Sequence, residues 1–210
     1  MYLWLFVLMV LNFGISWFNA WSVGHTWPET QTLGGWPKFL AWCGAVMSAC
    51  GFTWVYLIVL ALIAGAAGWL EPRYVEAMLS LGYLVIIAPV LGSGIALTIE
   101  SWMRFWKQRT FGSGAVAGWN TFAQVYNMYQ GVSAIPRALG NVMDVFGDRK
   151  SSRDDGDSGK GAMAMLAILL VVVAVAGGVL TTTLILRHAA KNHARAMTVM
   201  SRQSIYHRTN

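Results

Sequence analysis

The sequence is poor in charged residues, which make up only 11% of its 210 residues. Soluble domains carry about 25% charged residues. Hydrophobic residues reach 56%, and they are clustered in long runs rather than spaced in amphipathic stripes. This composition argues against an ordinary soluble domain and predicts an all-α integral membrane protein.

Cysteine is also scarce, with only Cys43 and Cys50 in the chain. Their spacing places both on one helix face but about 10 Å apart along the axis, too far for a disulfide bond with each other. Further metal-ligating residues are missing from their neighbourhood in the sequence. We therefore expect two small buried side chains rather than a metal or redox centre.

Motifs for catalysis are lacking as well. The sequence has no HExxH, phosphate loop, CxxC or Ser-His-Asp arrangement with a nucleophile elbow. His188 and His193 have a poor spacing for a metal site on a helix, and Glu100 precedes Arg104 at the spacing of a helical ion pair. We therefore expect a non-enzymatic protein without catalytic residues, metal or cofactor.

The N-terminal segment carries no charge in its first 24 residues. A secretory signal needs a basic n-region and a small-x-small cleavage site after its apolar core, and this segment has neither. The segment is expected to be an uncleaved first membrane span.

Apolar runs predict four transmembrane helices, at 2–21, 39–70, 75–99 and 162–186. Only the residues "EPRY" separate the second run from the third, which predicts antiparallel neighbours. The first three spans form a predicted bundle over 1–110. Eight of the Trp residues fall near predicted span ends and indicate an aromatic belt at the headgroup level; they are Trp17, Trp21, Trp27, Trp36, Trp42, Trp69, Trp102 and Trp106.

We expect one interruption of helical structure between the first two spans and another within the third span. Pro28 and Gly34 lie between the first two runs and predict an ordered loop rather than a helix. Pro89, followed by Gly92 and Gly94, predicts a kink or a break in the third span.

The segment 111–146 differs from the spans in having an apolar stripe and an amide-rich face. Steps of three or four residues between the large apolar side chains indicate a helix, which Pro136 should kink or break. We expect two amphipathic helices that lie on the membrane surface, against a partner, or against the protein's own spans. The residues predicted to dock are Trp119, Phe122, Tyr126, Tyr129, Ile135 and Leu139.

The remaining segments are polar. Residues 147–161 are rich in Gly, Ser and charge and predict a flexible linker, and residues 187–210 form a basic C-terminal tail. The net charge of +6 is concentrated just outside apolar runs, which favours anionic lipid over nucleic acid as partner. The residues predicted to contact lipid headgroups are Arg104, Lys107, Arg109, Arg187, Lys191 and Arg195.

Orientation follows from the Lys and Arg residues on each side of a four-span bundle. Nine of the 15 lie on the side that carries the connections 22–38 and 100–161, and six on the side of the termini. The positive-inside rule then places the loop 104–161 in the cytoplasm and both termini in the periplasm.

These features predict a non-enzymatic inner-membrane protein that is a membrane-embedded subunit or scaffold of a larger secretion, conjugation or phage-related assembly. Its expected partners are the lipid bilayer and either other proteins or further copies of itself. The alternative is a small oligomeric pore or permeability factor, lined by the polar residues Asn12, Ser16 and Asn19 of the first span.

Overall fold

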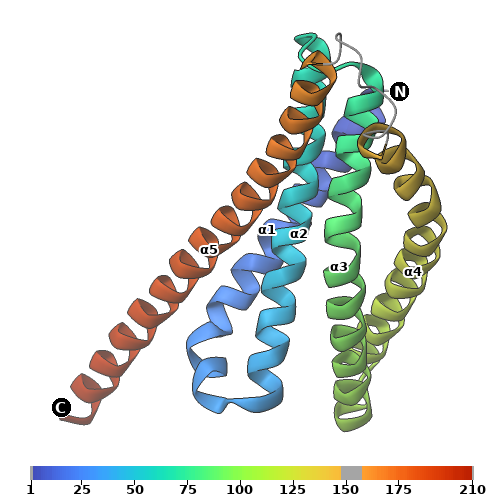
Figure 1. Cartoon of the computed structure of the whole chain (residues 1–210). Coiled ribbons are helices and arrows are strands. Elements are labelled where there is room, and N and C mark those ends of the chain that lie inside the picture. The colour runs from blue at the N-terminus through green and yellow to red at the C-terminus, as the bar shows by residue number, and fades with distance from the viewer. Residues whose placement is uncertain (1, 148–157, 210) are drawn as a thin grey trace.

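The computed structural model describes residues 2–147 and 158–209, and in these residues it is entirely helical (Figure 1). The helices are α1 (Tyr2–Leu33), α2 (Gly35–Ala66), α3 (Pro72–Gln108), α4 (Phe111–Phe146) and α5 (Ser158–Thr209). The predicted all-α class is therefore confirmed.

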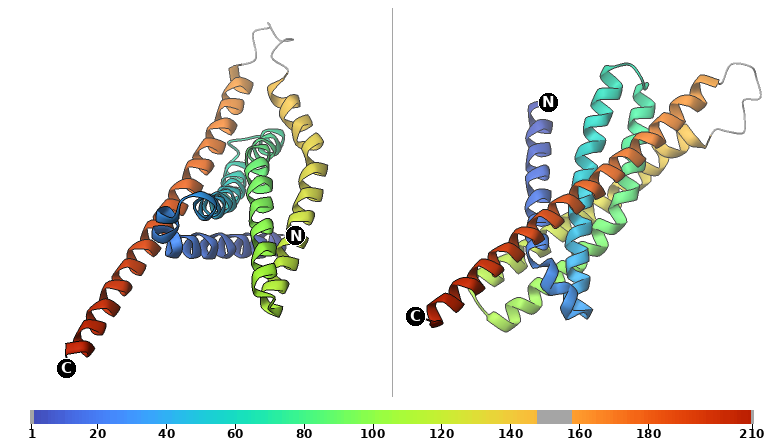
Figure 2. Two further views of the ribbon diagram at one scale, coloured as in Figure 1. Left: turned by 90° about the horizontal axis from the view of Figure 1, so that it is seen from below. Right: turned by 90° about the vertical axis from the view of Figure 1, so that its left-hand side faces the viewer.

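Successive helices run in alternating directions, up and down through one bundle (Figures 1 and 2). The connection between α1 and α2 is the single residue Gly34, and only Arg109 and Thr110 separate α3 from α4. Such short connections make neighbours in sequence neighbours in space. The two ends of the chain lie at opposite ends of the bundle (Figure 1).

Within the described residues, three helical stretches are long and apolar enough to cross a membrane: Gly35–Ala66, Pro72–Gln108 and Gly161–Met197. They contain the third and fourth predicted spans and most of the second, whose helix ends at Ala66 rather than at residue 70. The fold thus fits an integral membrane protein. A crossing by α1 stays a prediction, and so does the four-span arrangement.

The predicted loop between the first two spans is wrong. Helix α1 continues through Pro28 to Leu33, and α2 begins at Gly35. Packing explains the difference, because Gly24 of α1 lies so close to α5 that an added Cβ would come within 2.8 Å of the Leu186 carbonyl oxygen. The turn falls on Gly34 and Gly35, whose positive φ values of 64° and 52° suit residues without a side chain.

Proline also fails to break the later helices. Helix α3 continues through Pro89, and α4 is one helix through Pro136 rather than two. Each proline removes one backbone hydrogen bond, but both helices pack side by side over most of their length, which holds them in register. The start of α4 is fixed by a capping box in which Thr110 and Ser113 satisfy each other's backbone N–H groups.

The central helix of the core is α2, which packs against α1, α3 and α5. Among the described residues, the largest fully buried side chains are Phe52 and Leu57 of α2 and Met78 of α3. Leu57 fills the space that the absent side chain of Gly82 leaves on α3. Helix α5 lies on α2 and α1 through a row of small or β-branched residues. The buried residues of this row include Ala167, Val171, Ala174, Thr182, Ile185 and Ala189.

The predicted linker 147–161 lies mostly outside the described residues, although its last four residues already belong to α5. The predicted C-terminal tail is a direct continuation of that helix, which remains helical to Thr209. At about 1.5 Å per residue, α5 is far longer than the roughly 30 Å of a bilayer core. It leaves the bundle at its C-terminal end (Figure 1).

Candidate functional site

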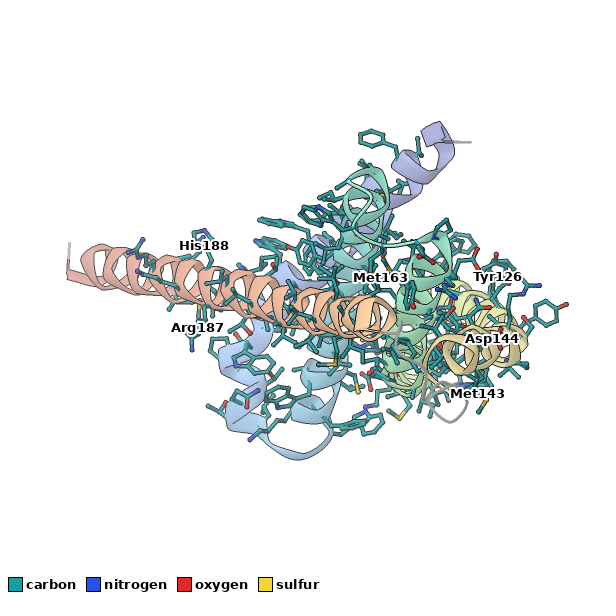
Figure 3. All side chains as sticks on the ribbon, turned by 45° about the horizontal axis from the view of Figure 1, so that its top comes forward. Tyr126, Met143, Asp144, Met163, Arg187 and His188 are labelled. Atoms are coloured by element: carbon teal, nitrogen blue, oxygen red, sulfur yellow. The ribbon has the colours of Figure 1, made fainter. Side chains whose placement is uncertain are left out.

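The predicted docking residues all lie on α4, and most of them face away from the bundle. Trp119 is 68% exposed and Tyr129 72%, whereas Ile135 is half-buried. The rings of Trp119, Phe122 and Tyr126 follow one another along the helix, with centroids 6.1 and 6.4 Å apart. Tyr126 and Met143 point outward in Figure 3. The large apolar side chains therefore form a continuous outer surface, which we call the outer face of α4; its exposed members are Val116, Trp119, Phe122, Val125, Tyr126, Met128, Tyr129, Val132, Leu139 and Met143.

The opposite side of α4 is buried against α3. It buries Ala117, Gln124, Gly131 and Ala138, which recur at every seventh position. A heptad repeat of this kind keeps one seam of a helix against a nearly parallel or antiparallel neighbour. Here the buried seam consists of small residues and one amide, and the large apolar side chains are exposed. A helix of a soluble protein does the opposite and buries its apolar side.

Hydrogen bonds join α3 to α4 along this seam. Gln124 is only 7% exposed, and its Nε2 donates to the carbonyl oxygen of Leu91 at 3.0 Å. The Tyr83 hydroxyl donates to the carbonyl oxygen of Gly131 at 2.9 Å. Further bonds across the interface run from Asn141 Nδ2 to Ser80 Oγ, from Thr98 Oγ1 to the Asn120 carbonyl oxygen and from Trp102 Nε1 to Thr121 Oγ1.

Glycine allows this close approach at the centre of the interface. The Gln124 side chain occupies the position that a Cβ of Gly94 would take. The Pro89–Gly94 region, which the sequence marked as a kink or break, is instead the surface on which the buried amide of α4 rests. Sequence reasoning missed this contact, although the spacing of Gly131 seven residues after Gln124 was a readable signal for a buried seam.

Three of the predicted headgroup residues, Arg104, Lys107 and Arg109, gather at the C-terminal end of α3, and all three are exposed. Arg109 adopts a left-handed conformation, with φ of 47°, and ends the helix. Trp106 is exposed between them. Basic side chains with an exposed indole are typical of a helix end at the headgroup level.

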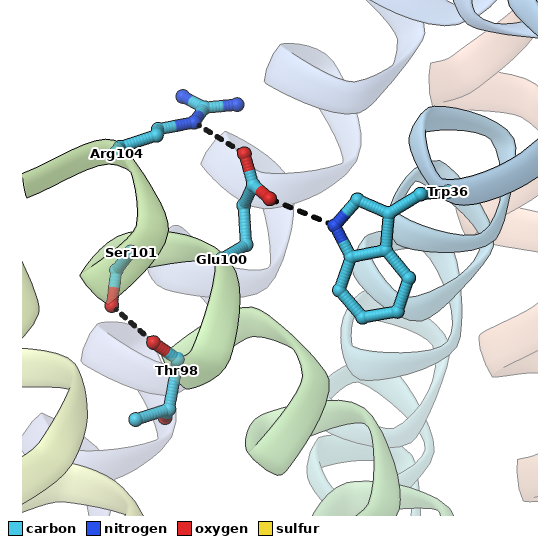
Figure 4. A network of polar contacts seen from close by, with 5 residues as sticks. All are labelled: Trp36, Thr98, Glu100, Ser101 and Arg104. Atoms are coloured by element: carbon cyan, nitrogen blue, oxygen red, sulfur yellow. Dashed lines mark hydrogen bonds and ion pairs between the residues drawn. The ribbon is translucent and has the colours of Figure 1, made fainter. Parts of the chain in front are cut away.

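Glu100 connects this end of α3 to α2 (Figure 4). Its carboxylate accepts a hydrogen bond from Arg104 Nε at 2.9 Å, the ion pair that the spacing predicted, and another from Trp36 Nε1 at 2.8 Å. Glu100 follows the apolar segment 75–99. Partial burial alone would raise the pKa of Glu100, but the hydrogen bonds from Trp36 and Arg104 and the positive charges of Arg104 and Lys107 outweigh it, and the pKa lies below its usual value.

A pocket of about 580 Å³ opens beside this network, between α1, α2, α3 and α4. Its polar lining comes from Asn19, Glu100, Ser101, Arg104, Gln108, Ser113 and Asn120. Asn19 is one of the three residues predicted to line a pore. The other two face α2, because Ser16 is buried and Asn12 Nδ2 donates to the carbonyl oxygen of Gly51 at 3.4 Å.

The other predicted headgroup residues, Arg187, Lys191 and Arg195, lie on α5 and are exposed. This part of α5 passes beside the C-terminal half of α1. His193 Nε2 lies 3.4 Å from Glu29 Oε1, and its ring packs at 4.5 Å against that of His25. The basic part of α5 is therefore held against the same end of the bundle as the connection between α1 and α2.

The fold defines a class of protein, an all-helical bundle whose long apolar helices fit a transmembrane protein. The site does not narrow this class further, because the described residues contain no group of three His, Cys, Asp or Glu side chains arranged to hold a metal ion. Comparison of the chain with family models, with curated proteins and with solved structures finds no match.

Proposed function

We propose that the chain is a non-enzymatic, multi-pass protein of the inner membrane that serves as a membrane-embedded subunit or scaffold of a larger assembly. A secretion, conjugation or phage-related machine is the kind of assembly that such a subunit fits. The observation that carries the proposal is α5, a single helix that continues from an apolar segment into a basic extension beyond the bundle.

The first turns of this extension are braced rather than free. Ala189 is fully buried against Gly24 of α1, and His193 pairs with Glu29. Such bracing fixes the direction in which the following residues leave the bundle. A rigid basic helix that starts at the membrane surface suits a protein partner with an acidic surface, or anionic headgroups, better than it suits a small-molecule substrate.

Site-specific photo-cross-linking in membranes tests the proposal. A photoreactive residue at Met197, exposed on the extension, should give discrete protein adducts, and the same partner should co-purify in mild detergent. The matched position Leu180, exposed on the apolar part of the same helix, should give none. Replacement of Lys191 and Arg195 by Glu should remove the adducts without lowering membrane yield. Equal adduct patterns at both positions, or no adduct at Met197, would contradict the proposal.

The alternative is a small oligomeric pore, and the pocket that Asn19 and Asn120 line is the observation that favours it. Conductance of the purified protein in planar bilayers separates the two functions. A scaffold should give no conductance, whereas a pore should conduct and lose selectivity when Asn19 is replaced by Leu.

A further inference from the structure

The outer face of α4 is an apolar surface that no other helix of the bundle covers. What covers it is a separate question from the function proposed above. We propose that its occupant is the hydrocarbon core of the bilayer, so that α4 crosses the membrane beside α3. With α1 to α3 and α5, the chain then crosses five times. This replaces the expected four-span arrangement, in which 111–146 is an arm at the cytoplasmic surface.

The length and charge of α4 fit a crossing. The sequence carries no charged residue between Arg109 and Arg137. At about 1.5 Å per residue the intervening segment spans roughly 40 Å, which exceeds the roughly 30 Å of the hydrocarbon core. The segment runs alongside α3, one of the helices that are apolar enough to span. A helix packed along a span for this distance reaches the same depth in the membrane.

Three of the amides that made a crossing unattractive in the sequence lie at the interface with α3, away from lipid. Gln124 and Asn141 donate to α3, and Asn120 is half-buried at the same interface. On the outer side, Gln130 Nε2 donates to the Tyr126 hydroxyl at 3.3 Å, and the Ser133 hydroxyl donates to a carbonyl oxygen of its own helix. Polar groups in a bilayer need hydrogen-bond partners of this kind. Membrane helices associate where small residues allow their backbones to approach closely and where polar side chains form hydrogen bonds between the helices.

Five crossings change where the basic clusters lie rather than how many basic residues each side has. Nine of the 15 Lys and Arg residues fall on the side of "RFWKQR" and the C-terminus and six on the other, the same ratio that four crossings give. Both basic clusters, 104–109 and 187–195, now share one side. By the positive-inside rule this side is the cytoplasm, with the N-terminus in the periplasm and the C-terminus inside.

Cysteine labelling at the two ends of α4 tests the crossing. In the full chain, with Cys43 and Cys50 replaced by Ala, single cysteines replace the exposed residues Gln108 and Asp144. In spheroplasts, a membrane-impermeant maleimide should label Asp144→Cys at once and Gln108→Cys only after permeabilisation. A reporter fused after Asn210 should signal cytoplasm. Labelling of both cysteines under the same condition would overturn the crossing, and wild-type membrane yield of each variant shows that it has folded.

Spin labels then test the occupant. Labels at Val125 and Tyr129 on the outer face should be accessible to oxygen, which partitions into lipid, and inaccessible to a water-soluble nickel chelate. A label at Lys107 should show the reverse. Low accessibility to both reagents at Val125 and Tyr129 would mean that a second copy or another protein covers the face, and would overturn lipid as its occupant. Neither measurement depends on the partner proposed for α5, so the two proposals fail separately.

Discussion

Helices α4 and α5 flank the same bundle, yet they pack by different means. Helix α5 is apolar on all sides over 162–180 and rests on α2 mainly through small and β-branched residues such as Ala174 and Ile185, with one hydrogen bond between Thr181 and Tyr56. Helix α4 has an apolar and a polar side, and it is the polar side that rests on its neighbour, with Gln124 as the buried amide. Both helices leave large apolar side chains exposed, among them Leu180 and Tyr129.

The difference shows that amphipathicity alone does not place a helix. In water the apolar side of an amphipathic helix must be buried, but beside lipid tails the hydrophobic effect no longer drives helices together. Small residues and hydrogen bonds then decide which side is covered. Helix α4 follows the second rule along its buried seam from Ala117 to Ala138, as the proposed crossing beside α3 requires.

The largest expected effect comes from overfilling the α5 interface. A Cβ added to Gly178 would lie 2.7 Å from the Ala49 carbonyl oxygen and 2.8 Å from the Thr53 amide nitrogen, and backbone atoms of α2 cannot turn aside. Gly178→Ala should therefore lower the free energy of unfolding by about 1–3 kcal/mol, measured by thermal denaturation in detergent. At Gly131 of α4 an added Cβ would meet the flexible end of Ile87, so Gly131→Ala should cost less.

Gly92→Ala is the matched control for both glycine variants, because nothing lies within 4 Å of the position of its Cβ. It should leave stability unchanged or raise it slightly. A loss at Gly92 as large as that at Gly178 would show that the cost of the added methyl group does not depend on the close contact with α2, and would contradict the packing explanation.

A smaller effect is expected from the amide of the α4 seam. Gln124→Ala removes the bond to the Leu91 carbonyl oxygen, and interhelical bonds in membranes contribute about 0.6 kcal/mol on average and up to about 1.7. We expect a loss in that range by thermal denaturation. Gln130→Ala, on the exposed side of the same helix, should change little. Equal losses would mean that the polar side of α4 is not held against α3.

The smallest effect is expected at Glu100. Because its pKa in the folded protein lies below its usual value of 4.5, the carboxylate stabilises the fold above pH 4.5, and this contribution is lost as the pH falls through the lower folded value. Glu100→Gln should lower the melting temperature slightly at pH 7. It should not change the melting temperature at a pH below the folded pKa of Glu100, where the wild-type carboxyl group is also neutral. A variant that melts below the wild type by the same amount at both pH values would contradict the ion-pair explanation.

Much of the fold is readable from the sequence, because runs such as 162–186 are long and almost purely apolar. The expected loop at Pro28 and the expected break at Pro136 are wrong for one reason, namely that contacts with neighbouring helices outweigh a single lost backbone hydrogen bond.

The candidate site was less readable than the fold. Local spacing identified the pair of Glu100 and Arg104, which is four residues apart, whereas the bond from Trp36 joins residues 64 positions apart. The apolar stripe of α4 was found by its period. Which side of the helix would be covered depended on Gly94, 30 residues earlier in the chain, and within α4 only the seven-residue spacing of small residues around Gln124 indicates it.

The measurement that tests the placement of α4 most directly is a depth series on its outer face. Val116, Val125 and Met143 are all exposed and make no contact that the fold needs, and each is replaced in turn by Arg. An Arg near the bilayer centre costs about 2.5–3.5 kcal/mol on insertion scales, whereas one near a helix end extends to the headgroups at little cost. We predict that Val125→Arg sharply lowers the yield of membrane-integrated, thermally stable protein, while Val116→Arg and Met143→Arg remain close to wild type. Equal yields for all three variants would show that the outer face of α4 lies in water or at the surface, and would contradict the crossing.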